Sequence, residues 1–298
     1  MRFLIIFLLS VVGIYLPGHQ LAARMVADQL GRHIIVPDDP QRIISLAPSI
    51  TEIIFALGRD QRLKGATQFS DFPPKAQDLP KVGSYIRLDL ERIVALEPDL
   101  CFAIKDGNPK SLVDRVESLG IPVYAVDPRN LASVMETLLE MGRLLNAAQR
   151  AHAIVEDMRA RIDRVKSVVA GTSSRPKVFF QIGISPIVSV GTKTFIHELI
   201  VLAGGKNLAQ GPTPYPRFSR EQILGLSPDI LIITSMTRGA SFEDVKKEWA
   251  QWPDLPAVKN DRILLVDSNL FDRPTPRLVD ALELLLELIH PEAIEKER

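Results

Sequence analysis

Short apolar runs alternate along the chain with segments whose apolar residues recur every three or four positions. The uninterrupted runs predict buried strands, and the helical spacing predicts amphipathic helices that pack on them. We predict strands at 43–47, 63–67, 100–104, 123–126, 178–182, 187–190, 230–234 and 263–266, and helices at 49–58, 89–96, 109–119, 195–203, 220–226 and 276–289. Strands that alternate with helices in this way predict parallel sheets covered on both faces. Ser49 and Glu52 are expected to form a capping box at the first of these helices.

A long helical segment separates the two halves of this pattern. Residues 131–169 contain no proline and a single glycine, Gly142. One continuous helix at about 1.5 Å per residue would be long for a globular domain. We therefore predict a break near Asn146, followed by a helix from about Ala148 to Val169. The predicted organisation is an N-terminal lobe at 24–145, a connecting helix at 146–171 and a C-terminal lobe at 172–298.

An internal repeat supports two related halves. Residues 88–100 align without gaps on 218–230, and each copy predicts a capped short helix, a Pro-Asp turn and a buried strand. Glu91 and Glu221 occupy equivalent positions in the first helical turns. A carboxylate there stabilises the helix dipole by about 0.3–1 kcal/mol, which requires no function. The two residues nevertheless offer one exposed acidic group on each half.

The N-terminus has the pattern of a secretory signal. Arg2 precedes the uncharged run 3–16, and small residues ending at Ala23 follow it. The run is shorter than the about 20 residues needed to span a bilayer. We predict a signal peptide at 1–23, with Ala23 the last residue removed, and therefore a soluble protein in the periplasm.

Composition and motifs favour binding over catalysis. The 36 basic and 36 acidic residues balance, so nucleic acid is not an expected partner. The one cysteine, Cys101, lies in an apolar run and is expected to be buried and unreactive. Glycine-rich phosphate loops, the nucleophile elbow and the zinc motif are absent, and the five histidines are scattered. We predict no catalytic residue, no metal site and no cofactor, hence no enzyme; an exported hydrolase or a sensor module is the alternative class.

The loops that follow the predicted strands carry the candidate binding chemistry. Ligands of doubly wound sheets bind at the carboxyl ends of the strands. The loops at those ends combine aromatic rings with polar groups, at 69–74, 83–85, 105–108, 183–186, 215–217 and 269–274. This lining suits a large, flat, partly apolar ligand held by hydrogen bonds at its edge. The competing explanation, that each aromatic ring only packs its own loop, is equally open.

Several of these segments resemble a known family. The runs 42–52, 69–74, 90–99 and 219–222 are similar to the helical-backbone (class III) substrate-binding proteins of bacterial ABC importers, and 179–186 and 271–277 add to the match. The similarity extends over about residues 32–290. It implies an α/β fold of two Rossmann-like lobes, each with a parallel-rich sheet flanked by helices, bridged by one long α-helix.

The resemblance also implies a ligand, a partner and a site. Within the family the chain is most similar to members that bind cobalamin, so the expected ligand is a corrinoid. The expected partner is the permease dimer of an ABC importer with its ATPase. The protein itself is expected to be a monomer. Glu91 and Glu221 match residues that dock on permease arginines. The ligand contacts that the resemblance implies are Phe69, Tyr85, Asn269 and Arg273. The candidate loops 183–186 and 269–274 add Ser185 and Phe271 to the predicted ligand set.

Departures from the family pattern keep an alternative ligand open. Cobalamin-binding members have tryptophan where this chain has Tyr85 and Ile104. Haem requires an axial ligand, for which Tyr85 and Tyr215 are candidates. A ferric siderophore would favour an arginine-rich cleft, and Arg217, Arg238 and Arg273 are the arginines at hand. Haem or a ferric siderophore is therefore the alternative.

Overall fold

The structure, a computed structural model, describes residues 22–234 and 242–297. Except for Ala22 and Ala23, the predicted signal peptide lies outside these residues, and so does Arg238, one of the arginines considered for a siderophore. Ala23 is the first residue of β1 (Ala23–Ala27), which pairs with β2 (His33–Pro37) in an antiparallel hairpin. Among the described residues, no helix is long and apolar enough to cross a membrane.

The N-terminal lobe is built on a four-stranded parallel sheet in the order β4-β3-β7-β8. Alternate residues of its strands enter different cores, as a pleated sheet requires. Ile43 and Phe102 pack with α1 and α4 on one face, whereas Ile44 and Cys101 pack with α2 and α3 on the other. The elements are β3 (Ile43–Ser45), α1 (Pro48–Ala56), β4 (Leu63–Ala66), α2 (Leu90–Ala95), β7 (Leu100–Ile104), α3 (Lys110–Ser118), β8 (Val123–Val126) and α4 (Leu131–Leu144).

The C-terminal lobe contains a six-stranded mixed sheet. Its order is β12-β10-β9-β13-β14, with β11 beside β9; β9, β13, β14 and β11 are parallel, whereas β10 and β12 are antiparallel additions. The strands are β9 (Lys177–Gly183), β10 (Ile187–Ser189), β11 (Lys206–Asn207), β12 (Arg217–Phe218), β13 (Ile230–Ile233) and β14 (Ile263–Leu265). The helices are α6 (Phe195–Leu202), α7 (Arg220–Leu226), α8 (Phe242–Trp249), α9 (Pro256–Lys259), α10 (Ser268–Phe271), α11 (Leu278–Ile289) and α12 (Pro291–Glu297). The predicted class of fold, two parallel-rich α/β lobes, is confirmed.

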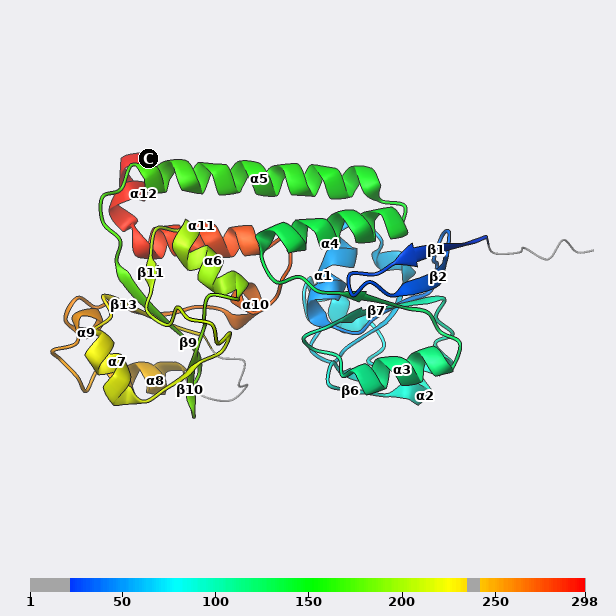
Figure 1. Cartoon of the computed structure of the whole chain (residues 1–298), viewed down its shortest axis with the longest axis horizontal. Helices are drawn as coiled ribbons and strands as arrows, with labels where there is room; N and C mark the ends of the chain where they lie inside the picture. The colour runs from blue at the N-terminus through cyan, green and yellow to red at the C-terminus, as the bar shows by residue number, and fades with distance from the viewer. Residues whose placement is uncertain (1–21, 235–241, 298) are drawn as a thin grey trace, which may run out of the picture.

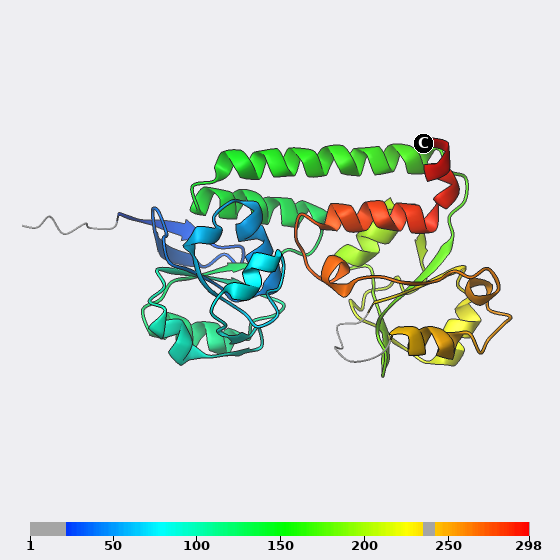
Figure 2. The same cartoon turned by 180° about the vertical axis from the view of Figure 1, so that it is seen from behind.

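One long helix lies across both lobes. Helix α5 (Ala148–Ala170) runs along the top of the molecule, above α4 and α11 (Figures 1 and 2). Asn146, with φ of 53°, adopts the left-handed conformation that asparagine tolerates, and this reverses the chain between α4 and α5. The predicted break near Asn146 and the predicted start at Ala148 are confirmed.

Helix α5 is joined to both lobes by a continuous core. Its apolar face, which includes Val155, Met158 and Ile162, belongs to a hydrophobic cluster that extends from α1 to α11. Arg161 of α5 also donates to Asp280 (2.6 Å) and Glu283 (2.9 Å) of α11. Because close-packed interiors resist deformation, this shared core favours two lobes with a fixed spacing.

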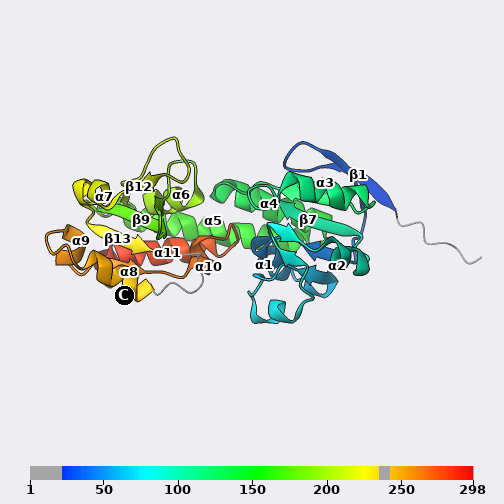
Figure 3. The ribbon, with the colours of Figure 1, turned by 90° about the horizontal axis from the view of Figure 1, so that it is seen from below.

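The internal repeat is confirmed. In the first copy β6 (Arg87–Leu88) leads into α2 and β7, and in the second β12 leads into α7 and β13. The side chain of Asp89 accepts from the Arg92 amide at the start of α2, and that of Ser219 accepts from the Gln222 amide at the start of α7. Helices α2 and α7 lie on the side of the molecule opposite α5, one on each lobe (Figures 1 and 3).

Some local expectations are corrected. Ser49 does not cap α1, because the helix begins at Pro48 with Ala47 as N-cap and no side-chain cap. Glu52 instead turns toward the other lobe, as described below. The hairpin β1–β2 and the short elements β5 (Gly83–Ser84), β6, β11, β12 and α8 to α10 were not predicted, and neither were the 3-10 helices Asp60–Arg62 and Pro74–Asp78. Cys101 is fully buried, as expected, and burial raises the pKa of its thiol.

Candidate ligand-binding site

A buried network of ion pairs connects the lobes at the ends of their strands. Arg273 follows α10 in the C-terminal lobe and is only 8% exposed. It donates to Glu52 of α1 and to Asp71 of the loop after β4, each at 2.8 Å. It also donates to the Phe69 carbonyl (3.1 Å) and to Asn269 Oδ1 (2.6 Å). One guanidinium therefore joins two N-lobe segments to α10.

A second arginine completes this network. Arg277 Nη1 lies 3.4 Å from Glu52 Oε2, and its guanidinium lies 3.8 Å from the ring centroid of Phe72, a cation–π contact. Burial raises the pKa of Glu52, and the hydrogen bonds and charges of the two arginines oppose that rise. We call Glu52, Asp71, Arg273 and Arg277 the interlobe clasp.

Tyr85 is positioned by hydrogen bonds at the carboxyl edge of the N-lobe sheet. Buried Asn108 donates to the carbonyls of Leu46 (2.9 Å) and Tyr85 (2.7 Å) and accepts from the Ile104 amide (2.8 Å). A Cβ atom on Gly107 would lie 3.0 Å from the Tyr85 ring, so that ring packs on the bare backbone of Gly107. The turn between β5 and β6 is thereby fixed beside the ends of β3 and β7.

Four charged residues line the edge of the N-terminal lobe next to Tyr85; we call them the N-lobe rim. Lys105 donates to Asp127 (3.1 Å), and Arg129 Nε donates to both oxygens of Asp127 (2.9 Å each). Asp106 Oδ1 lies 4.0 Å from Arg129 Nη2. The positive and negative charges of the rim balance.

Tyr215 of the C-terminal lobe faces this rim. Tyr215 lies two residues before β12 and is 54% exposed. Partial burial raises the pKa of the Tyr215 hydroxyl, and the carboxylates of Asp106 and Asp272 add to the rise while Arg129 opposes it. Because Asp106 and Arg129 belong to the N-terminal lobe, their effect places the Tyr215 hydroxyl within electrostatic range of the opposite lobe.

The structure brings together only part of the predicted ligand set. Phe69, Asn269 and Arg273 meet in the clasp, and Tyr85 lies at the same edge of the N-lobe sheet. Ser185 is exposed in the turn between β9 and β10. Phe271 is 0% exposed and its ring lies 5.5 Å from that of Phe180 in the C-lobe core. The expectation that Phe271 lines the cleft is therefore corrected, since its ring faces the interior.

Two residues at the cleft, Asp106 and Arg129, were not among the candidates predicted from the sequence. Tyr215 was a candidate only as an axial ligand of haem, and Asp106 belonged only to the candidate loop 105–108. A signal for Tyr215 was present: Tyr85 precedes Glu91 by six residues, and Tyr215 precedes Glu221 by the same spacing in the internal repeat. No comparable signal marks Arg129, because its neighbours across the cleft come from the other half of the chain.

The two predicted docking residues are exposed in the first turns of α2 and α7. Hydrogen bonds with the Ser219 side chain and the backbone hold the pKa of Glu221 below its ordinary value, so this carboxylate is charged at neutral pH. Since α2 and α7 share one side of the molecule, Glu91 and Glu221 are carried by equivalent elements of the two lobes.

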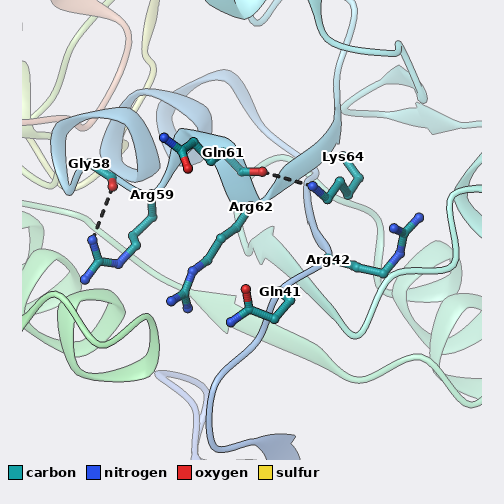
Figure 4. A pocket seen from close by; sticks show the side chains of 7 residues that line it. All are labelled: Gln41, Arg42, Gly58, Arg59, Gln61, Arg62 and Lys64. Atoms are coloured by element: carbon teal, nitrogen blue, oxygen red, sulfur yellow. Dashed lines mark hydrogen bonds between the residues drawn. The ribbon is translucent and has the colours of Figure 1, made fainter.

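A pocket of about 630 Å³ lies elsewhere on the N-terminal lobe. Figure 4 shows its lining, which comprises Gln41, Arg42, Gly58, Arg59, Gln61, Arg62 and Lys64. These residues are at the amino ends of β3 and β4, away from the carboxyl ends where the clasp and the rim lie. Arg42 donates to the carbonyls of Leu96 and Glu97 at the end of α2, and Arg62 pairs with Asp39. The polar groups of this pocket thus serve helix ends and local pairs.

Two α/β lobes under one long helix, with a polar interface at the ends of their strands, define a two-lobed binding protein. The sequence matches the model of the periplasmic binding protein family over residues 43–270, and the chain belongs to that family. The predicted periplasmic location agrees with this membership, and ABC transporter substrate-binding proteins are among the relatives of known structure.

The individual relatives include vitamin B12-binding and heme-binding proteins. The vitamin B12-binding protein of Vibrio campbellii is 32% identical over 260 residues, which cover 87% of this chain and 92% of the relative. The crystal structure of the periplasmic vitamin B12 binding protein of Vibrio cholerae superposes with a TM-score of 0.74 at 28% identity, covering 85% of this chain and 98% of that one. A periplasmic heme binding protein from Pseudomonas aeruginosa gives a TM-score of 0.77 at 27% identity, covering 85% and 93%. Similarity of fold alone therefore does not choose between a corrinoid and haem.

Proposed function

We propose that this protein binds a corrinoid, cobalamin in the first instance, between its lobes and delivers it to an ABC importer without catalysing a reaction. The observation that carries the proposal is the charge balance of the cleft. Lys105, Arg129, Arg273 and Arg277, the cations of the rim and the clasp, each have a carboxylate within 4.0 Å. Together, the rim and the clasp thus carry little net charge.

This balance favours an uncharged ligand edge. Haem has two carboxylate groups, and ferric siderophores that are anionic require cations that are free to pair with them. Cobalamin instead carries neutral primary carboxamides around its ring. Carboxamides both donate and accept hydrogen bonds, so they can bind beside existing ion pairs without displacing a partner.

The chemistry of Tyr215 also favours a corrinoid over haem. A tyrosine that binds ferric haem does so as a phenolate, which nearby carboxylates disfavour. The pKa of Tyr215 is raised by partial burial, by Asp106 and by Asp272, so its hydroxyl stays protonated at neutral pH. The ring can still stack on a flat macrocycle. The names of the curated relatives support the same choice of ligand.

Delivery is assigned to Glu91 and Glu221. Both are exposed on equivalent helices, α2 and α7, on the side away from α5. Carboxylates in this symmetric arrangement suit charge-assisted contacts with arginines on the two halves of a permease dimer that carries its ATPase. The proposed docking species is a monomer, whose two lobes supply one carboxylate each.

Isothermal titration tests the ligand. The mature protein is titrated with cyanocobalamin, haemin and a ferric hydroxamate siderophore in the same buffer. We expect saturable one-to-one binding of cyanocobalamin, and weak or no binding of the two iron compounds. Binding of haemin or of the siderophore without binding of cyanocobalamin would replace the proposed ligand and leave the family assignment in place.

A further inference from the structure

The N-lobe rim contains a carboxylate and a guanidinium that lie close together without forming a hydrogen bond to each other. Arg129 Nη2 and Asp106 Oδ1 are 4.0 Å apart, which is beyond hydrogen-bond distance. Both side chains are accessible, at 53% exposure for Arg129 and 68% for Asp106. Arg129 uses its Nε for Asp127, so the N–H groups on Nη1 and Nη2 are available to another acceptor.

A donor and an acceptor presented side by side match one chemical group in particular. A primary carboxamide can accept from the guanidinium through its oxygen and donate to the carboxylate through its nitrogen. A ligand carboxylate at the same place would meet the negative charge of Asp106, and a ligand amine would meet the positive charge of Arg129.

We propose that Asp106 and Arg129 form a specificity-determining pair that binds a primary carboxamide on the edge of the ligand, opposite Tyr215. This inference rests on the proposed function, since the carboxamides belong to the corrinoid ring. In this proposal the N-lobe rim binds a carboxamide more tightly than a carboxylate at one position on the edge of the ligand.

The surrounding contacts fix the Arg129 guanidinium and the backbone of the turn that carries Asp106 before the ligand arrives. Asp127 accepts from Lys105 and from Arg129, and its backbone amide donates to Gln29 Oε1 at 2.6 Å. The Arg129 amide donates to Ser133 Oγ at 2.7 Å. On the other side, the amide of Asn108 donates to the Ile104 carbonyl at 2.9 Å and closes the turn that carries Asp106. A held guanidinium and a fixed turn reduce the entropy lost on binding, which supports discrimination.

The inference is tested with cyanocobalamin and its monocarboxylic acids, in each of which one peripheral carboxamide is hydrolysed to a carboxylate. Titration calorimetry at pH 7.5 compares the wild type with Asp106→Asn. The control is Asp163→Asn, which removes an exposed carboxylate from α5, far from the rim. We expect the wild type and the control to bind cyanocobalamin about tenfold more tightly than one of the acids, and Asp106→Asn to reduce that ratio to about twofold.

A second variant tests the donor. Arg129→Gln removes the guanidinium and should weaken cyanocobalamin binding about tenfold, the loss expected for a hydrogen bond to a charged group. Equal affinity of the wild type for cyanocobalamin and all its acids would overturn the inference, as would a ratio unchanged by Asp106→Asn. Absence of any cyanocobalamin binding by the wild type would overturn the proposed function itself, and this outcome is distinct from a loss of discrimination.

Discussion

The interlobe clasp makes a quantitative prediction about stability. In Arg273→Met, Glu52 loses the partner 2.8 Å away while its own side chain remains 3% exposed. Removing one member of a buried ion pair costs about 3–5 kcal/mol, because the other charge stays buried. Arg277 still lies 3.4 Å from Glu52 Oε2, so the lower end of this range applies. We expect a loss of about 3 kcal/mol in the free energy of unfolding at pH 8.

The loss should shrink at lower pH. Burial already raises the pKa of Glu52 in the wild type, and removal of Arg273 raises it further. A carboxyl group with a raised native pKa binds more protons when folded than when unfolded, so stability falls as pH rises from its ordinary value of 4.5 toward the native pKa. Because the native pKa of Glu52 is higher in the variant, the stability of the variant falls over a wider pH range than that of the wild type. The difference in unfolding free energy between the two should therefore be smaller at pH 5 than at pH 8.

Urea unfolding followed by circular dichroism at pH 5, 6, 7 and 8 measures this difference. Lys110→Gln serves as the control, because it breaks an exposed pair with Asp114 and should cost less than about 1 kcal/mol. The double variant Glu52→Gln with Arg273→Met removes both charges and should recover about half of the loss. A deficit below about 1 kcal/mol at every pH, or one that does not depend on pH, would refute this reasoning.

Three further predictions concern the site and its partner. Asn108→Ala should weaken cyanocobalamin binding and lower the free energy of unfolding by about 2 kcal/mol, because the carbonyls and amide that it joins lose their partner; calorimetry and urea unfolding measure the two effects. Tyr85→Ala and Tyr215→Ala should each weaken cyanocobalamin binding by about 1–2 kcal/mol through lost stacking, and an unchanged titration midpoint would remove that residue from the site. Glu91→Ala with Glu221→Ala should leave cyanocobalamin affinity intact and abolish uptake in a transport assay, so a loss of binding would place these residues in the cleft or the fold instead.

The main features of the fold could be predicted because they depend on local pattern. The strand at Leu100–Ile104 is a continuous apolar run buried on both faces, and the helix at Ala148–Ala170 has a long apolar stripe without a breaker. Two-residue strands such as β11 and β12 contain too few positions to show a period. The hairpin β1–β2 was missed for another reason: its alternation leaves Met25 and Ile35 on an exposed face, so no buried run marks it.

The site was harder to predict because its partners are far apart in sequence. Glu52 and Arg273 are separated by 221 residues, and the local pattern around Glu52 is equally typical of a helix cap. Phe271 and Arg273 are only two residues apart in sequence, yet their side chains point in different directions. The Phe271 ring enters the C-lobe core, whereas the Arg273 side chain reaches Glu52 of the opposite lobe. Sequence indicates which loops meet at the strand ends, whereas the direction of each side chain follows from packing between lobes.

The crystal structure of the complex with cyanocobalamin tests the central claim most directly. The account predicts a corrin ring between the lobes, in contact with Tyr85 and Tyr215, with the pair Glu52–Arg273 intact and a ligand carboxamide between Asp106 and Arg129. A corrin ring bound outside the cleft, for example in the pocket lined by Arg42 and Arg62, would contradict it.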